Sequence, residues 1–248
     1  PAHHSDLVYA PFRMNTTGVT ILPGLPSTQK DRIPAFLSDL RAADVRQIAL
    51  FPTVLTQAER QELYRELADI PRLWIPHVHL RTDCDEAEMR FLERQFGTEL
   101  FNIHPRKSIH AFGPLPESRA ERIFVENTQD APEDAELALC GGVCIDYSHL
   151  ESARRLGWSD YVTTVEGQLR RFPIGCCHIA AIREGEPNSW NGGPDHHKFR
   201  QLSDFDYLSK YSWALPARWL SLELENTLPE QLEAADYARR LLSVPKPG

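Results

Sequence analysis

The sequence predicts an α/β fold, a single (β/α)8 barrel domain over residues 1–248. Eight short apolar runs alternate with longer segments in which apolar residues recur every three or four positions. This alternation favours parallel strands separated by helices, and the chain length is typical of one such barrel. The alternative, a doubly wound open sheet with a dinucleotide site, has no support because no GxGxxG segment follows the first run.

The expected strands are short and rich in Val, Ile, Leu and aromatic residues, which favour extended backbone. They cover residues 18–24, 46–53, 73–80, 100–105, 122–127, 141–147, 174–182 and 219–226.

The expected helices carry their own start and stop signals. They cover residues 31–45, 56–70, 83–97, 159–172 and 229–242. Thr56 with Glu59 has the pattern of a capping box, Gly97 suits a helix C-cap, and Pro229 suits a helix start. The fourth and fifth βα connections are shortened and lack a clear helix. The seventh connection, residues 183–218, is long and rich in Gly, Pro and Asn.

The net charge, the apolar runs and the cysteine spacing exclude several classes of protein. The formal net charge of −8 argues against broad non-specific nucleic-acid binding and fits a site that holds cations. No apolar run reaches the roughly 18 residues of a membrane span, and the first residues lack the pattern of a secretion signal. The five cysteines do not have the spacing of a zinc finger or a disulfide framework. We therefore expect reduced thiols in a cytoplasmic protein that does not enter a membrane.

Residue types that bind metals gather where the expected strands end. They are His77, His79, His104, Glu126, Asp146, His149, His178, Glu223 and Glu225, with Asp195, His196 and His197 in the seventh connection. In a (β/α)8 barrel the carboxyl ends of the strands meet on one face, and that face carries the function. A single histidine at a strand end is ordinarily a hydrogen-bonded structural residue. The repetition of the pattern favours a metal site, because unpaired carboxylates are costly to bury.

The mixture of imidazole and carboxylate ligands favours zinc, with Mn, Co, Fe or Mg as alternatives. As many as nine ligands exceed what one tetrahedral ion can use. We therefore expect two or three ions that share carboxylates, an arrangement typical of hydrolytic enzymes.

The motifs resemble those of the xylose-isomerase-like barrel superfamily and, within it, the endonuclease IV family of apurinic/apyrimidinic endonucleases. The resemblance runs from about residue 73 to residue 228. It is carried by the segments WIPHVHL, LFNIHP, FVENTQ, GVCIDYSH, CCHIAA, PDHHKF and WLSLELEN. Each motif is weak alone, but their order on eight βα units is specific for the superfamily.

The resemblance implies a trinuclear zinc centre with nine ligands. These are His77, His104, Glu126, Asp146, His149, His178, Asp195, His197 and Glu223. Three other histidines, His79, His110 and His196, are then surface or supporting groups. Glu225 is the close rival of Glu223, because residues two apart on a strand face the same way. Glu223 is preferred because it ends the apolar run of RWLSLE as Glu126 ends that of RIFVE.

The sequence also departs from the endonuclease IV pattern. No histidine turn follows the first strand in TILPGLPS, and the motif after His178 reads Ile-Ala-Ala where Asn-Asp is common in the family. Loops that would read DNA have no match. The metal ligands can therefore be present in an enzyme with another substrate.

Two enzyme classes fit these residues, and an inactive metal-binding scaffold is a third possibility. The first is a phosphodiester hydrolase, endonuclease IV-like, acting on damaged DNA or a small phosphorylated substrate. In it Glu126 would hold or deprotonate the attacking water. Cations just past strand ends would bind phosphates: Arg81, Arg106, Lys107, Arg183 and Lys198.

The second class is an isomerase or epimerase acting on a sugar or sugar phosphate. It needs one Mn, Co or Mg ion, bound by Glu126, Asp146, His178 and Glu223. The glutamates at the ends of the fifth and eighth strands would serve as acid and base. His149 and Arg183 would bind substrate oxygens. The number of bound ions separates the two classes.

Overall fold

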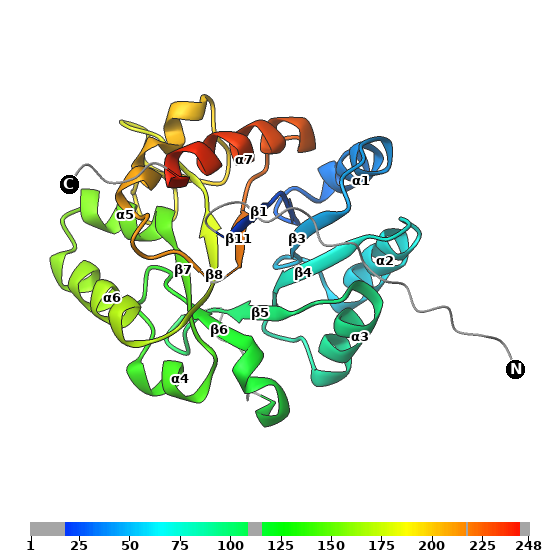
Figure 1. Ribbon diagram of the computed structural model, residues 1–248, viewed down its shortest axis with the longest axis horizontal. Helices are drawn as coiled ribbons and strands as arrows, with labels where there is room; N and C mark the ends of the chain where they lie inside the picture. The colour runs from blue at the N-terminus through cyan, green and yellow to red at the C-terminus, as the bar shows by residue number, and fades with distance from the viewer. Residues whose placement is uncertain (1–17, 109–115, 217, 244–248) are drawn as a thin grey trace, which may run out of the picture.

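A nine-stranded parallel sheet closes into a barrel at the centre of the protein (Figure 1). The computed structural model describes residues 18–108, 116–216 and 218–243. The strands follow the order β1-β11-β8-β7-β6-β5-β4-β3-β2. At the two ends of this order, β1 (Thr20–Leu22) pairs with β11 (Trp219–Leu222) and β2 (Gly24–Pro26) pairs with β3 (Gln47–Phe51).

Only Pro23 separates β1 from β2, and together they form the first barrel strand. Proline has no N–H to donate to a neighbouring strand, so the ladder is interrupted there and resumes on the other side. The remaining strands are β4 (Trp74–His79), β5 (Leu100–Ile103), β6 (Ile123–Glu126), β7 (Gly142–Asp146) and β8 (Ile174–Ile179). The eight expected strands are present, and the predicted (β/α)8 fold class is confirmed.

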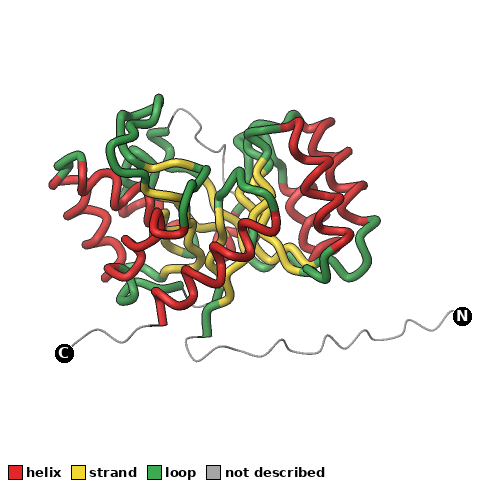
Figure 2. Tube along the Cα trace, turned by 90° about the horizontal axis from the view of Figure 1, so that it is seen from above, coloured by secondary structure: helices red, strands yellow, loops and turns green. Residues whose placement is uncertain are grey.

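Helices surround the strands on the outside of the barrel (Figure 2). Five of them fall at the expected segments: α1 (Ile33–Ala42), α2 (Gln57–Ala68), α3 (Glu86–Phe96), α6 (Ser159–Arg171) and α7 (Leu228–Ser243). A 3-10 turn, η1 (Lys30–Arg32), precedes α1. The Thr56–Glu59 capping box forms at the start of α2, and Gly97 ends α3 with φ 66°.

The connections after β5 and β6 contain little helix, as the sequence predicts. The described residues there form the 3-10 helix η2 (Glu117–Arg122) and the six-residue α4 (Asp134–Leu139). The connection after β7 contains a helix that the sequence analysis missed, α5 (Tyr147–Arg155). It begins directly at the end of β7, so no loop marks its start. The long seventh connection forms a small antiparallel pair, β9 (Ala181–Ile182) with β10 (Asp195–His196), and the 3-10 helix η3 (Leu202–Lys210).

Side chains fill the inside of the barrel. They include Leu22, Ala49, Phe51, Leu100, Phe124, Cys144, Cys176 and Trp219. The backbones of β2 and the segment at the end of β11 lie so close together that only glycine fits at position 24. A Cβ there would lie 2.0 Å from the carbonyl oxygen of Leu222. The five cysteines are free thiols. Among the described residues, no helix has both the length and the apolar character that crossing a membrane requires.

Candidate metal centre

Four buried side chains meet at the carboxyl ends of the barrel strands. Glu126 ends β6, Asp146 ends β7, His178 lies in β8 and Glu223 follows β11. Asp146 and His178 are register partners on neighbouring strands, which brings them side by side. One ligand atom from each of the four residues lies within 4.8 Å of the others. Three carboxylates and an imidazole at this spacing form a donor set that suits a divalent transition metal.

Unsatisfied polar atoms in this group indicate where a cation fits. Within the described chain, Oδ2 of Asp146 and both ring nitrogens of His178 are buried without a hydrogen-bond partner. Nδ1 of His178 lies 3.4 Å from a carboxylate oxygen of Glu126 and of Glu223. Buried polar atoms are nearly always hydrogen-bonded, so several such atoms in one group require an explanation. A divalent cation coordinated by these atoms supplies one, and the residues fit it.

The charges in the group are strongly coupled. Burial raises the pKa of Glu126, but the charge of His178 and the contact with His79 outweigh burial and hold that pKa well below its usual range. Burial likewise raises the pKa of Glu223, while the charges of His197 and His178 lower it to about 2. Burial lowers the pKa of His178, yet Glu126 and Glu223 raise it well above the ordinary value. The carboxylates of Glu126 and Glu223 are therefore ionised at neutral pH, and they attract positive charge.

A second donor group shares Glu126 with the first. It contains His79, His104 and Glu126, with ligand atoms within 4.8 Å of one another. Nε2 of His79 lies 3.0 Å from Nε2 of His104 and 3.1 Å from Oε2 of Glu126. Nδ1 of His79 lies 3.0 Å from the carbonyl oxygen of Leu80, which fixes the proton on Nδ1. Nε2 is then the nitrogen that can bind a metal, as is usual for ligand histidines.

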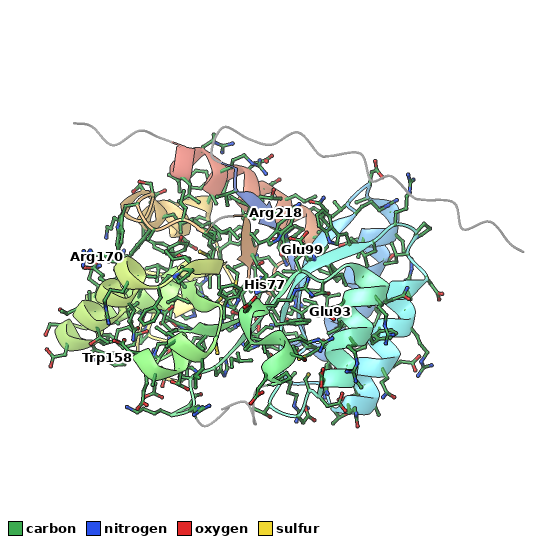
Figure 3. The ribbon with its side chains drawn as sticks, turned by 60° about the horizontal axis from the view of Figure 1, so that its bottom comes forward. His77, Glu93, Glu99, Trp158, Arg170 and Arg218 are labelled. Atoms are coloured by element: carbon green, nitrogen blue, oxygen red, sulfur yellow. The ribbon has the colours of Figure 1, made fainter. Side chains whose placement is uncertain are left out.

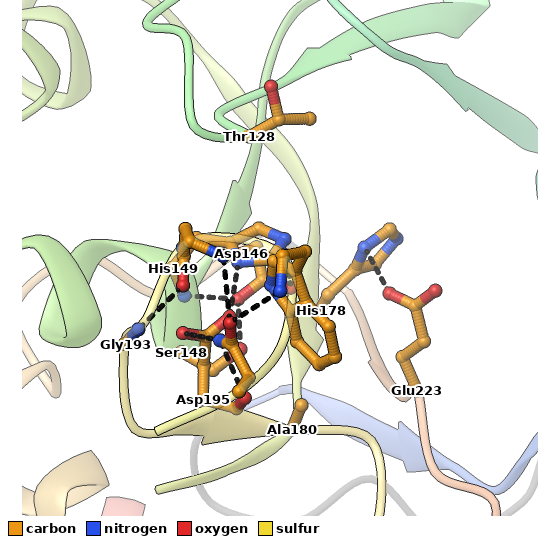
Figure 4. A network of polar contacts seen from close by, with 12 residues as sticks. Thr128, Asp146, Ser148, His149, His178, Ala180, Gly193, Asp195 and Glu223 are labelled. Carbon is orange, nitrogen blue, oxygen red and sulfur yellow. Dashed lines mark hydrogen bonds and ion pairs between the residues drawn. The ribbon is translucent and has the colours of Figure 1, made fainter. Parts of the chain in front are cut away.

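Two further predicted ligands, His149 and Asp195, lie next to Asp146 (Figure 4). Nδ1 of His149 lies 3.1 Å from Oδ2 of Asp195, and its Nε2 lies 3.8 Å from Oδ2 of Asp146. Burial lowers the pKa of His149, but Asp146 and Asp195 raise it to about 10. His197 lines the same cleft as His149. His149, Asp195 and His197 are in none of the groups of three or more ligand atoms within 4.8 Å of one another that the described residues form, so their role as metal ligands stays a prediction.

Asp146 has two roles in the local structure. Its Oδ1 accepts hydrogen bonds from the backbone N–H of His149 (2.8 Å) and from the hydroxyl of Ser148 (2.5 Å), and so caps the start of α5. Its Oδ2 is the atom without a partner. The cap also places His149 in the first turn of α5, directly beside the ligand group.

The structure does not bring His77 to this cluster. His77 lies inside the barrel (Figure 3), with Nδ1 2.6 Å from the hydroxyl of Ser221 and Nε2 2.9 Å from Oδ1 of Asn102. His79, which the sequence analysis set aside, lies at the mouth. Both side chains face inward because they are two residues apart, but His79 is the last residue of β4. The end of the strand, rather than the Pro-His motif, is the signal that identifies the residue at the mouth.

The two rival glutamates separate in the structure. Glu223 lies in the cluster, whereas the carboxylate of Glu225 accepts hydrogen bonds from the side chains of Thr28 (2.7 Å) and Gln29 (2.6 Å). Strand alternation would place them together, but β11 ends at Leu222, so the rule no longer applies.

The sequence predicts a surface or supporting role for two other histidines, His196 and His110. His196 contacts the carbonyl oxygen of Glu186 through Nε2 (2.8 Å), outside the ligand groups. His110 lies outside the described residues.

A cleft of about 680 Å³ opens over the cluster. Of the five cations predicted to bind substrate, Arg81 lines it. The other four do not line the cleft. Lys107 pairs with Glu133 (2.8 Å), and Arg183 pairs with Glu186. Arg106 lies 3.9 Å from Glu136, and the side chain of Lys198 is exposed. Charge and chain position alone could not distinguish these side chains from Arg81.

Three asparagine and tryptophan side chains around the site were missed. Asn102 donates a hydrogen bond from Nδ2 to Oε2 of Glu126 (2.7 Å). Asn188 donates to Oδ1 of Asp195 (2.9 Å), and Trp190 lines the cleft. The inward-facing position of Asn102 on β5 was a usable signal, whereas the loop that carries the other two offers none.

No protein-family model and no curated protein matches this chain. Solved structures do. That of SacUVDE is 12% identical, with a TM-score of 0.47 over 91% of this chain and 100% of the other. N-(5′-phosphoribosyl)anthranilate isomerase from Pyrococcus furiosus is also 12% identical, with a TM-score of 0.42 and the same coverage.

A third similar structure is that of the IOLI protein with a bound zinc atom. It is 12% identical, with a TM-score of 0.30 over 89% of this chain and 73% of the other. These likenesses are of fold. The barrel implied by the resemblance to the xylose-isomerase-like superfamily is present, and the narrower endonuclease IV assignment stays a prediction.

Proposed function

We propose that this chain is a metal-dependent phosphodiester hydrolase with more than one metal ion in its site. The observation that supports this most directly is the position of Glu126. One of its carboxylate oxygens faces His79, and the other faces His178, so a single side chain belongs to two donor groups. A carboxylate shared in this way is suited to bridge two neighbouring cations.

When bound, such a pair of divalent cations lowers the pKa of water and stabilises the charge that develops on a phosphoryl group. The chain's own residues provide the rest. Asn102 fixes the orientation of Glu126, Asn188 fixes that of Asp195, and the helix cap fixes that of Asp146. Arg81 lies on the cleft wall, where its guanidinium can bind a phosphate oxygen. Pre-set ligands of this kind reduce the reorganisation that substrate binding requires.

A sugar or sugar-phosphate isomerase is the second candidate. It is favoured by one observation, that Glu126, Asp146, His178 and Glu223 form a complete four-ligand group by themselves. Such an enzyme would use one ion, with Glu126 and Glu223 as the acid and the base. It has no need of His79 and His104.

The test removes the second donor group and keeps the first. The variant His104→Ala would be compared with the native chain for metal equivalents by elemental mass spectrometry and for hydrolysis of bis(p-nitrophenyl) phosphate. If the chain is the proposed hydrolase, we expect two or more equivalents of Zn, Mn or Fe in the native chain. The variant should lose one equivalent and most of the hydrolysis.

The matched control is His196→Ala, because His196 lies outside the donor groups. It should keep both properties. One ion per native chain, kept by His104→Ala and accompanied by ketose isomerisation, would replace the hydrolase with the isomerase.

A further inference from the structure

A large aromatic side chain is exposed at the mouth of the cleft. Trp190 is 46% exposed and lines the cleft together with His149, His197 and Glu223. Its ring centroid lies 5.7 Å from that of His197, with the two planes tilted by 37°. The indole of Trp190 therefore packs against His197 on one side and is open to solvent on the other.

The loop that carries Trp190 is held in place by a buried asparagine. Oδ1 of Asn188 accepts hydrogen bonds from the backbone N–H groups of Trp190 (3.1 Å), Asn191 (2.9 Å) and Gly192 (3.2 Å). Its Nδ2 donates to Asp195, one of the candidate ligands. The same side chain thus ties the tryptophan to the metal centre. An exposed ring that is held rigidly in this way binds a flat partner at low entropic cost.

The cleft offers few positive charges to a polyanion. Arg81 is the one lysine or arginine that lines it among the described residues, and Arg81 also contacts Asp83 at 3.4 Å. Nucleic-acid duplexes are bound through many phosphate contacts at once, so a single arginine suits a substrate with one phosphate.

We propose that Trp190 is a stacking platform for a nucleobase, and that the substrate class is a nucleotide-sized phosphodiester. Its base stacks on Trp190, and its phosphate lies over the metal centre near Arg81. This inference rests on the proposed hydrolase function and adds the substrate class to it. In the reaction, the oxygen of a water molecule bonds to phosphorus, the ester bond to the leaving group breaks, and one proton of the water goes to the leaving oxygen, so that the products are a nucleoside monophosphate and an alcohol or phenol.

Two substrates with the same leaving group test the stack. They are p-nitrophenyl thymidine 5′-phosphate, which carries a base, and methyl p-nitrophenyl phosphate, which does not. With the metal-loaded full chain, Trp190→Ala should raise KM for the thymidine ester by about 5- to 150-fold, the effect of losing one base–aromatic stack, with kcat little changed. Its kcat/KM for the methyl ester should stay the same. Trp190→Phe should restore most of the affinity because it keeps a ring.

Trp158→Ala is the matched control. Trp158 is 37% exposed and lies on the outer helical layer away from the cleft, so both substrates should be unaffected (Figure 3). An equal effect of Trp190→Ala on both esters, or none on either, would overturn the platform and leave the hydrolase function intact. Faster cleavage of abasic duplex DNA than of the thymidine ester, unchanged in Trp190→Ala, would overturn the substrate class.

A failure of hydrolysis is separable from a failure of the stack. If neither ester is cleaved, the proposed function fails, and thymidine 5′-monophosphate binding, measured by isothermal titration calorimetry, decides the inference. Weaker binding by Trp190→Ala, with native binding by Trp158→Ala, supports the platform for another reaction of nucleotides. Equal binding by both variants and the native chain overturns it.

Discussion

The side-chain amide of Asn102 connects two buried residues, the candidate metal ligand Glu126 and the histidine His77 inside the barrel. Its Nδ2 donates to Oε2 of Glu126 over 2.7 Å, and its Oδ1 lies 2.9 Å from Nε2 of His77, whose Nδ1 is in turn 2.6 Å from the hydroxyl of Ser221. A chain of hydrogen bonds therefore runs from the inside of the barrel to the carboxylate shared by two donor groups.

This relationship predicts the effect of Asn102→Ala. Glu126 would lose the donor that fixes one of its oxygens, and loss of such an outer contact typically weakens metal binding by about 10- to 100-fold. Competition with a chromogenic chelator measures the affinity. A variant with native metal affinity would show that Glu126 is held by other contacts.

His77 and His79 should respond in opposite ways to alanine substitution. His77→Ala removes a buried partner of Asn102 and Ser221, and should lower the free energy of unfolding by about 1–3 kcal/mol while the number of bound ions stays the same. His79→Ala should remove metal from the second donor group with a smaller effect on the metal-free fold. Urea unfolding of the metal-free variants and elemental analysis of the loaded ones give the two readouts. Loss of metal from the His77 variant alone would reverse the assignment.

Removal of metal should lower thermal stability. The cluster holds several ionised carboxylates together, and a ligand bound only by the folded state stabilises it by about 2.7 kcal/mol at a hundredfold excess over Kd. The melting temperature should fall on treatment with EDTA and recover when zinc is added. The variant Asp146→Ala, which lacks one ligand, should show a smaller difference. An unchanged melting temperature in the native chain would contradict tight metal binding.

A buried ion-pair network away from the site predicts a pH dependence of stability. The carboxylate of Glu151 accepts hydrogen bonds from Arg155 (2.9 Å), Lys210 (2.7 Å) and the hydroxyl of Tyr211 (2.9 Å). Burial raises the pKa of Glu151, but these partners outweigh it and hold the pKa below its ordinary value. The stabilisation is therefore present above the unfolded-state pKa and is lost as the pH falls through the lower pKa of the folded state.

The variant Glu151→Gln isolates this effect. At pH 7 it should lower the free energy of unfolding by about 1–3 kcal/mol because two cations lose their buried partner. The difference from the native chain should shrink in acid. Glu62→Gln is the control, since Glu62 forms an exposed pair with Arg65 on α2 and should change little. A Glu151→Gln difference that is independent of pH would mean that shape, rather than charge, is what the site requires.

The sequence predicted the eight strands because a barrel strand is apolar along its whole length and bounded by turn residues. It did not predict α5, whose start coincides with the end of β7 and is set by a cap that doubles as a candidate ligand. The choice between His77 and His79 depended on where β4 ends, and that between Glu223 and Glu225 on where β11 ends. Strand ends are the least predictable part of a strand, and in this fold they carry the candidate site.

The placement of the cations could not be read from the sequence for another reason. Arg183 and Lys107 lie past strand ends as Arg81 does, but they pair with Glu186 and Glu133 and do not line the cleft, whereas Arg81 lines it while also contacting Asp83. Similarly, nothing local distinguishes Trp190 from the exposed Trp213, since only the packing of the loop against Asp195 places it at the cleft. Such contacts join residues from different elements and exist only in the folded chain.

The two carboxylate oxygens of Asp146 connect the start of helix α5 with the candidate metal centre. Because Oδ1 fixes the helix start while Oδ2 has no hydrogen-bond partner, a cation bound by Oδ2 would also hold Oδ1 in place. Asparagine at this position would keep the cap and reduce the charge, whereas alanine would lose both. If a cation binds there, amide exchange in the first turn of α5, which contains His149, should slow when the ion is added.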